Sequence, residues 1–184
     1  MKLKEFRVTN YKSVIDSGPI KISDITCLVG KNEAGKTSLL KALNTLKPIR
    51  GEEASFSVTD DYPRAEVSDY QADIDNGTKK HINAITAKFE LDQSDVDKIE
   101  QILGPNFVRS RMLSLSKHYD NILYFALSVD EIAAIKHLTA NFAPELQAEA
   151  LKAENAKELL GIVEPHANDS AVSPVIKIGA DLDS

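Results

Sequence analysis

A glycine-rich segment near the N-terminus combines the residue types that hold a phosphate group. It fits the pattern G-x-x-x-x-G-K-[ST] with Gly30, Lys31, Asn32, Glu33, Ala34, Gly35, Lys36 and Thr37. Glycines at both ends let the backbone turn its N–H groups toward one centre, where they can surround a phosphate. Lys36 would reach the β- and γ-phosphates as the catalytic residue, and the Thr37 hydroxyl would coordinate Mg²⁺. The segment therefore predicts a site for a nucleotide and its Mg²⁺ ion.

The flanking segments are those that position such a loop. Residues 25–29, Ile-Thr-Cys-Leu-Val, form a short apolar run typical of a buried strand, which makes Cys27 a small core residue. Residues 36–46 carry leucines and an alanine at three- and four-residue spacing and predict an amphipathic helix. The N-terminus of that helix adds unsatisfied N–H groups, and Ser38 in its first turn can reach the α-phosphate. The alternative interpretation is a glycine-containing turn before an ordinary helix.

The rest of the chain predicts an α/β fold, in which a mixed β-sheet with flanking helices is followed by a helical segment. Strands are expected at residues 3–9, 14–15, 20–22, 82–91, 112–117 and 122–128, the last two as a hairpin. Helices are expected near 92–103 and over 131–160, and a long loop over 49–80. The predicted parts are a nucleotide-binding lobe at 1–129, a helical segment at 130–163, and a tail at 164–184 with a candidate strand at 175–178.

Composition limits the class of protein. The 184 residues are 42% hydrophobic and 27% charged, enough apolar side chains to fill a core. The single cysteine excludes an internal disulfide, and the longest apolar run, 122–127, is far short of the roughly 20 residues of a membrane span. The N-terminus lacks the apolar core of a signal peptide. We therefore expect a soluble, cytoplasmic protein that makes no use of a membrane.

Charge is distributed unevenly along the chain. Residues 1–50 hold ten Lys/Arg and four Asp/Glu, a net charge of +6, whereas residues 51–184 carry −12. A basic first quarter suits an anionic ligand, although chance clustering on a solvated surface is the alternative. The acidic remainder argues against a broad nucleic-acid surface on this chain. The four histidines, at 81, 118, 137 and 166, lack metal-ligand spacing.

Three segments together resemble a known family. They are residues 8–13, Val-Thr-Asn-Tyr-Lys-Ser; Asn32 inside the loop; and residues 36–43, Lys-Thr-Ser-Leu-Leu-Lys-Ala-Leu. This combination resembles the RecF/SMC/OLD-type branch of the ABC-class, AAA-related P-loop ATPases. The resemblance is strong over residues 1–46, looser over 82–128 and weak beyond 130.

The resemblance implies that ATP and Mg²⁺ are the ligands and that Lys12 and Ser13 lie near the nucleotide. Glu33 occupies a position that is often small in the family, so we expect it to face solvent or a partner subunit. Family members sandwich ATP between two heads, which implies a homodimer or a second head as partner, and many act on DNA in repair, recombination or phage defence. The helices at 131–160 would then cover the lobe or begin a dimerisation arm.

The second half of a family site is not found in this sequence. We find no Ser-Gly-Gly-type signature, Asp-Glu strand or switch histidine. The C-terminal ATPase lobe that carries them in the family is therefore an expected partner that this sequence does not supply. Residues 122–131 imitate the Asp-Glu strand, with Asp130 as a Mg²⁺ group and Glu131 polarising water, but Asp130 is equally placed to cap a helix. Gln93 either senses Mg²⁺ or lies in the first turn of a helix.

Three hypotheses follow from these observations. The first is an ATP–Mg²⁺-binding half-site of a larger ATPase. The second is a self-contained small P-loop hydrolase or kinase that uses Asp130 and Glu131. The third is an interaction or dimerisation module whose phosphate loop is vestigial.

Overall fold

The computed structural model describes residues 1–31, 35–46 and 55–176. Asn32, Glu33 and Ala34, all predicted site residues, lie outside the described residues. The chain divides into two compact units, which are described separately. We call Met1–Leu91 with Met112–Leu127 the sheet unit, and Asp92–Arg111 with Ser128–Ser184 the helical unit. No helix in the described ranges is long and apolar enough to cross a membrane.

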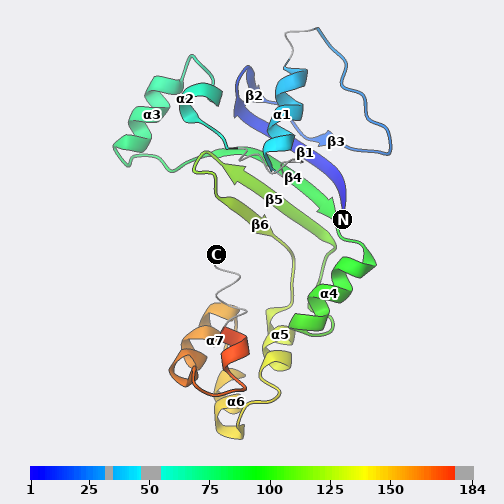
Figure 1. The fold of residues 1–184 in the computed structure, drawn as a ribbon, viewed down its shortest axis with the longest axis vertical. Coiled ribbons are helices and arrows are strands. Elements are labelled where there is room, and N and C mark those ends of the chain that lie inside the picture. Colours follow the sequence, from blue (N-terminus) through cyan, green and yellow to red (C-terminus); the bar gives the residue numbers. More distant parts are fainter. Residues whose placement is uncertain (32–34, 47–54, 177–184) are drawn as a thin grey trace. The chain divides into compact units, whose positions relative to one another are not determined.

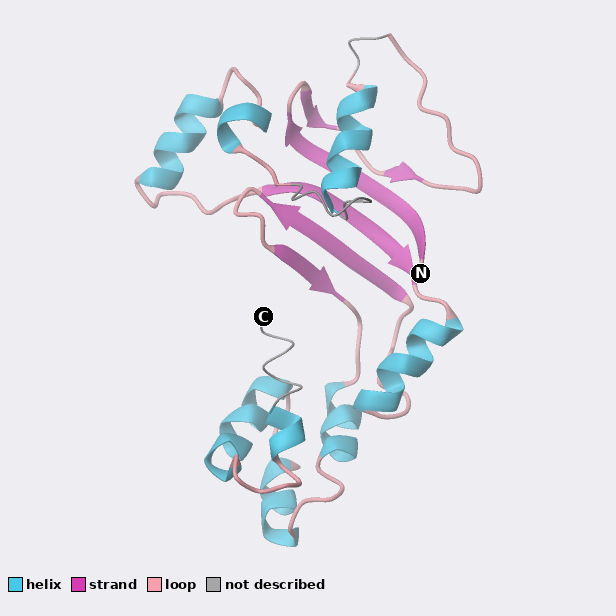
Figure 2. Ribbon diagram, in the orientation of Figure 1, coloured by secondary structure: helices cyan, strands magenta, loops and turns pink. Residues whose placement is uncertain are grey.

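In the sheet unit, the described strand pairings are all antiparallel (Figures 1 and 2). The strands are β1 (Lys2–Tyr11), β2 (Val14–Asp16), β3 (Ile20–Lys21), β4 (Asn83–Glu90), β5 (Met112–His118) and β6 (Leu123–Ala126). Their order is β2-β1-β4-β5-β6, and β3 also pairs with β1. One register row crosses four strands through Phe6, Ala87, Leu115 and Phe125. The predicted α/β class with flanking helices is confirmed.

Helix α1 (Lys36–Leu46) lies on β1 and β4, where the prediction placed a helix (Figure 1). Ala42 has no exposed surface, and its small side chain allows the helix to approach the sheet closely. Val8 and Ile85, both fully buried, face each other across β1 and β4 and belong to the same core. This packing fixes the start of α1, and with it Lys36 and Thr37, relative to the sheet.

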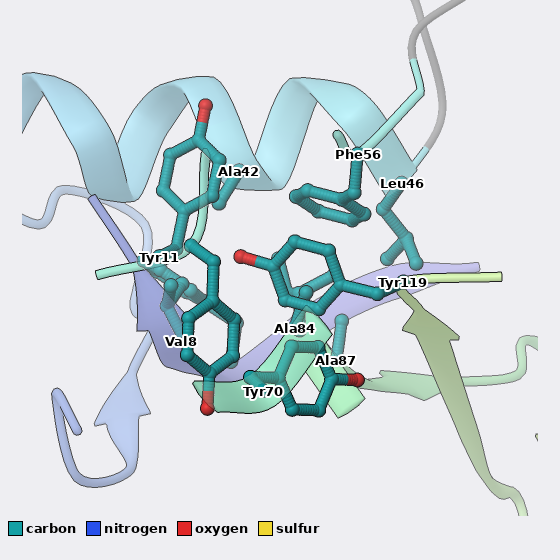
Figure 3. Packing of buried hydrophobic residues seen from close by; sticks show 12 residues of the cluster. Val8, Tyr11, Ala42, Leu46, Phe56, Tyr70, Ala84, Ala87 and Tyr119 are labelled. Carbon is teal, nitrogen blue, oxygen red and sulfur yellow. The ribbon is translucent and has the colours of Figure 1, made fainter. Parts of the chain in front are cut away.

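The prediction of a long loop over 49–80 is wrong in part, because two helices form within this range. These are α2 (Val58–Asp61) and α3 (Val67–Asp75). Tyr62 and Tyr70 stack with ring centroids 4.2 Å apart, and both rings contact Tyr119. Figure 3 shows Tyr70 and Tyr119 in the same core as Tyr11 and Phe56, close to α1. Burial of these aromatic rings stabilises helices that the polar composition of the segment does not favour.

The prediction of a buried strand at 25–29 is also wrong. Within the described part of the chain these residues belong to no strand, and Ile25 and Val29 are 85% and 90% exposed. Cys27 is exposed, so it is not the core residue that the pattern predicts. The physical reason is that a β-branched run becomes a buried strand only where neighbouring strands pair with it and layers cover it.

The helical unit is held together by its own apolar core. Its helices are α4 (Gln93–Leu103), α5 (Glu131–Leu138), α6 (Pro144–Ala150), α7 (Ala156–Val163) and the short 3₁₀ helix η1 (Glu164–His166). Ile135, Leu146, Leu159 and Val163 are buried in this core. Residues 173–176 are helical, whereas a strand was expected at 175–178, of which Lys177 and Ile178 lie outside the described residues. Val175 packs into the same core, which accounts for its apolar character without a sheet.

Candidate nucleotide-binding site

The predicted phosphate loop ends where α1 begins, and its last glycine adopts a backbone conformation that suits glycine. Gly35 has φ +75°, in the left-handed region. A Cβ added there would lie 2.8 Å from Cγ2 of Val14 and 3.3 Å from Oγ of Ser13. The turn between β1 and β2 therefore packs directly against the phosphate loop. This contact brings Ser13, one of the predicted site residues, to the loop.

Lys36 folds back over the loop that precedes it. Its Nζ donates hydrogen bonds to the carbonyl oxygens of Gly30, at 2.6 Å, and Lys31, at 2.5 Å. The ammonium group is thus held over the backbone of the segment that is expected to surround a phosphate. Phosphate oxygens are stronger acceptors for an ammonium than neutral carbonyls, so this group can exchange partners when an anion binds.

The first turn of α1 suits an anion. It contains no acidic residue, whereas the first turns of α4, α5 and α7 carry Asp95, Glu131 and Glu158. Carboxylates at those positions offset the partial positive charge of a helix N-terminus. The first turn of α1 instead begins with Lys36, which adds a full positive charge to the partial charge of the helix N-terminus.

An open groove of about 410 Å³ runs from the predicted Mg²⁺ ligand along α1. It is lined by Tyr11, Thr37, Leu40, Lys41, Asn44 and Thr45. Thr37 is exposed and Ser38 is half-buried, so the Thr37 side chain is accessible at the start of the helix. Burial and the nearby charge of Asp61 raise the pKa of Tyr11 to about 12, so its hydroxyl stays neutral at physiological pH.

Lys12 lies in the turn after β1 with φ +55° and is paired with α2. Its Nζ is 3.4 Å from Oδ1 of Asp61, and its backbone N–H donates to the Asp61 carbonyl at 2.5 Å. Asp61 was not predicted as a site residue. No sequence signal connects it to Lys12, because the two are 49 positions apart and meet only through the packing of α2.

Asp130 and Glu131 have structural partners within the helical unit. Asp130 caps α5 by accepting from the Ala133 amide at 3.1 Å, and it pairs with Arg109 at 2.6 Å. The hydrogen bond from the Ala133 amide and the Arg109 guanidinium hold the pKa of Asp130 below its usual range. Oε2 of Glu131 accepts from the amide of Ala156 at 2.8 Å. These contacts favour the capping interpretation over a catalytic acidic pair.

Gln93 is the first residue of α4, the position that the alternative interpretation assigned to it. Its amide donates to Oδ1 of Asp97 at 2.8 Å, and its carbonyl oxygen accepts from Arg111. Both contacts lie within the helical unit. In the described ranges, no group of three or more His, Cys, Asp and Glu side chains is arranged to hold a metal ion.

A pair of substitutions separates capping from catalysis. We expect Asp130→Ala to lower Tm by about 3 °C, since it removes a helix cap, and to change the affinity for Mg²⁺-ATP by less than about twofold. Glu131→Gln should also leave the affinity unchanged. Thermal melts and calorimetric titrations measure both effects, with Glu145→Gln in the first turn of α6 as the control for charge. A tenfold loss of affinity in Asp130→Ala would contradict the capping interpretation and show that Asp130 takes part in nucleotide binding.

One comparison with known proteins, a family model, agrees with the loop motif. Residues 1–175 match the family model described as an AAA ATPase domain. A solved SMC ATPase chain, studied for ATP-driven dimerization and DNA-stimulated activation, matches with 14% identity and a TM-score of 0.35. That match covers 83% of this chain and 76% of the other. No curated protein matches.

Proposed function

The chain belongs to the AAA ATPase domain family, and on that premise we propose that it is the ATP–Mg²⁺-binding half-site of a larger ATPase of the RecF/SMC type. The observation that carries the proposal is the position of Lys36. Its ammonium lies over the phosphate-loop carbonyls at the start of a helix whose first turn has no acidic residue. This is the charge distribution that a triphosphate requires.

In the proposed mechanism, each described residue of the loop has one task. Lys36 exchanges the Gly30 and Lys31 carbonyls for β- and γ-phosphate oxygens, and the amides at the start of α1 donate to the same phosphates. Thr37 would offer its hydroxyl oxygen as a Mg²⁺ ligand, and a bound ion would supply charge neutralisation for the triphosphate. Asn32, Glu33 and Ala34 belong to the proposed loop by sequence. Ser13 lies next to Gly35 of the loop, and Ser38 lies in the first turn of α1.

Two features support a half-site rather than a complete enzyme. Asp130 and Glu131 are engaged in capping contacts, so no acidic pair is assigned to Mg²⁺ or to the attacking water. The apolar run at 25–29 exposes Ile25 and Val29 next to the phosphate loop. We propose that a C-terminal ATPase lobe covers this run and that a second head, in a homodimer, completes the site. DNA would then be contacted through the whole protein, in repair, recombination or phage defence in the cytoplasm.

Phosphate release by the chain alone tests this proposal. We expect no release above that of Lys36→Ala, because the chain binds ATP without the groups that activate water. Steady release that is lost in both Lys36→Ala and Glu131→Gln would contradict the half-site and support a self-contained hydrolase.

A second candidate function is a nucleotide-independent interaction module. It is favoured by apolar side chains on the edge strand β6 and the turn before it, where Ile122, Leu123 and Phe125 are about half exposed. A stable dimer in sedimentation, together with no nucleotide binding, would support this candidate in place of the ATPase half-site.

A further inference from the structure

The sheet unit contains a carboxylate that holds one of the predicted nucleotide-binding lysines. We propose that the Asp61 carboxylate positions the Lys12 ammonium and competes with the nucleotide phosphates for it. When ATP binds and takes the ammonium, the contact between α2 and the turn between β1 and β2 is released. The inference rests on the proposed function, because it assigns a regulatory role to residues beside the same site.

The contact between Lys12 and Asp61 is a charge pair that can be broken. The 3.4 Å between Nζ and Oδ1 is longer than a strong charged hydrogen bond, and 40% of the Lys12 side chain is exposed. The Lys12 ammonium also lies 5.5 Å from the centre of the Tyr11 ring. A long, exposed lysine can leave such a pair without a change in the backbone, since its stem has four rotatable bonds.

Asp61 cannot follow the lysine. Its side chain is only 14% exposed, and Oδ2 accepts a hydrogen bond from the Ser57 amide at 3.0 Å, at the start of α2. The carboxylate is therefore anchored in the helix, and the lysine is the mobile partner. When Lys12 leaves, Asp61 loses a counter-ion in a largely buried place, which weakens the hold of the turn on α2.

The turn that carries Lys12 already lies against the phosphate loop. A Cβ on Gly35 would be 3.3 Å from Oγ of Ser13, the residue next to Lys12. Gly35 of the loop thus lies against Ser13 of the turn, and a triphosphate held by the loop would lie beside the turn. A bound triphosphate offers several charged oxygens, whereas Asp61 offers one free carboxylate oxygen, so the phosphates compete effectively for the ammonium.

Titration of Mg²⁺-ATP into four variants tests the competition. Because Asp61→Asn removes the competing charge, it should bind Mg²⁺-ATP about three- to five-fold more tightly than the wild-type chain. The gain should vanish in Lys12→Ala/Asp61→Asn compared with Lys12→Ala, and it should be absent with adenosine. Asp60→Asn is the matched control, since it makes the same charge change in α2, where Asp60 contacts Ser57 and not Lys12. Unchanged or weaker binding by Asp61→Asn would overturn the competition.

A second measurement needs no substitution and remains informative if Asp61→Asn folds poorly. Hydrogen exchange of the Lys12 amide, which donates to the Asp61 carbonyl and so joins the turn to α2, should be faster in the wild-type chain saturated with Mg²⁺-ATP. Equal or slower exchange would contradict the release of α2. If the wild-type chain binds no nucleotide, both the proposed function and this inference fail. Normal binding with unchanged Asp61→Asn affinity overturns this inference alone.

Discussion

Replacing Lys36 with alanine should lower the affinity for Mg²⁺-ATP by at least about 30-fold, without a change in Tm beyond about 2 °C. The Lys36 ammonium is the full positive charge that the structure places over the phosphate-loop carbonyls. Its loss would leave the phosphates without the counter-charge that offsets their desolvation, whereas the amides of α1 contribute only partial charges. Isothermal calorimetry with a parallel thermal melt measures both quantities.

Lys21→Ala is the matched control for that experiment. It removes the same charge from the basic first quarter of the chain, but Lys21 is exposed on β3, in register with Glu5 and outside the phosphate loop. Its affinity should stay within about twofold of wild type, because long-range charge effects are screened at physiological salt. If Lys36→Ala and Lys21→Ala lose affinity equally, the effect comes from net charge and not from the loop.

The second large effect is expected for Gly35→Ala, which should both destabilise the sheet unit and weaken nucleotide binding by more than about tenfold. An alanine at φ +75° is strained by about 1 kcal/mol or more, and its Cβ would lie 2.8 Å from Cγ2 of Val14. The side chain of Val14 is β-branched and has little freedom to move away. The loop must therefore shift from the start of α1, where its amides are needed. Thermal melts and titration of Mg²⁺-ATP measure the two losses.

Gly18 separates backbone strain from the clash. It has φ +63°, similar to Gly35, but a Cβ there would meet nothing within 4 Å. Gly18→Ala should therefore cost only the strain and leave nucleotide affinity unchanged. Adding Val14→Ala to Gly35→Ala removes the close atom and should restore part of the lost affinity. Equal effects of Gly18→Ala and Gly35→Ala would show that contact with the β1–β2 turn is unimportant.

The elements best predicted from the sequence are those whose periodicity and termini agree. Residues 36–46 form a helix as predicted, because their apolar stripe meets the sheet through Ala42 and Leu46. The hairpin of β5 and β6 follows from alternation, and the helix after Asp92 begins at a residue type that caps helices. In α3, the spacing of Val67, Tyr70 and Ile74 is also helical, a signal that the acidic composition of 49–80 concealed.

The features that could not be predicted depend on contacts between distant residues. The rings of Tyr62 and Tyr70 both pack against Tyr119, which lies far along the chain. Local apolar character at 25–29 predicts a strand, but a strand also needs a neighbour to pair with. The pairing of Lys12 with Asp61 could not be predicted for two reasons: the residues are distant in sequence, and the helix α2 that carries Asp61 was itself unexpected. The loop motif was recognised because its chemistry is local in sequence.

An amide NMR titration of the ¹⁵N-labelled chain with Mg²⁺-ATP would show directly which residues the nucleotide contacts. We expect the largest shifts at Gly30, Gly35, Lys36 and Thr37, with smaller shifts at Lys12 and Ser13, and we expect all of them to disappear in Lys36→Ala. Either no shifts at ligand excess or shifts centred on the helical unit around Asp130 would contradict a nucleotide site at the phosphate loop.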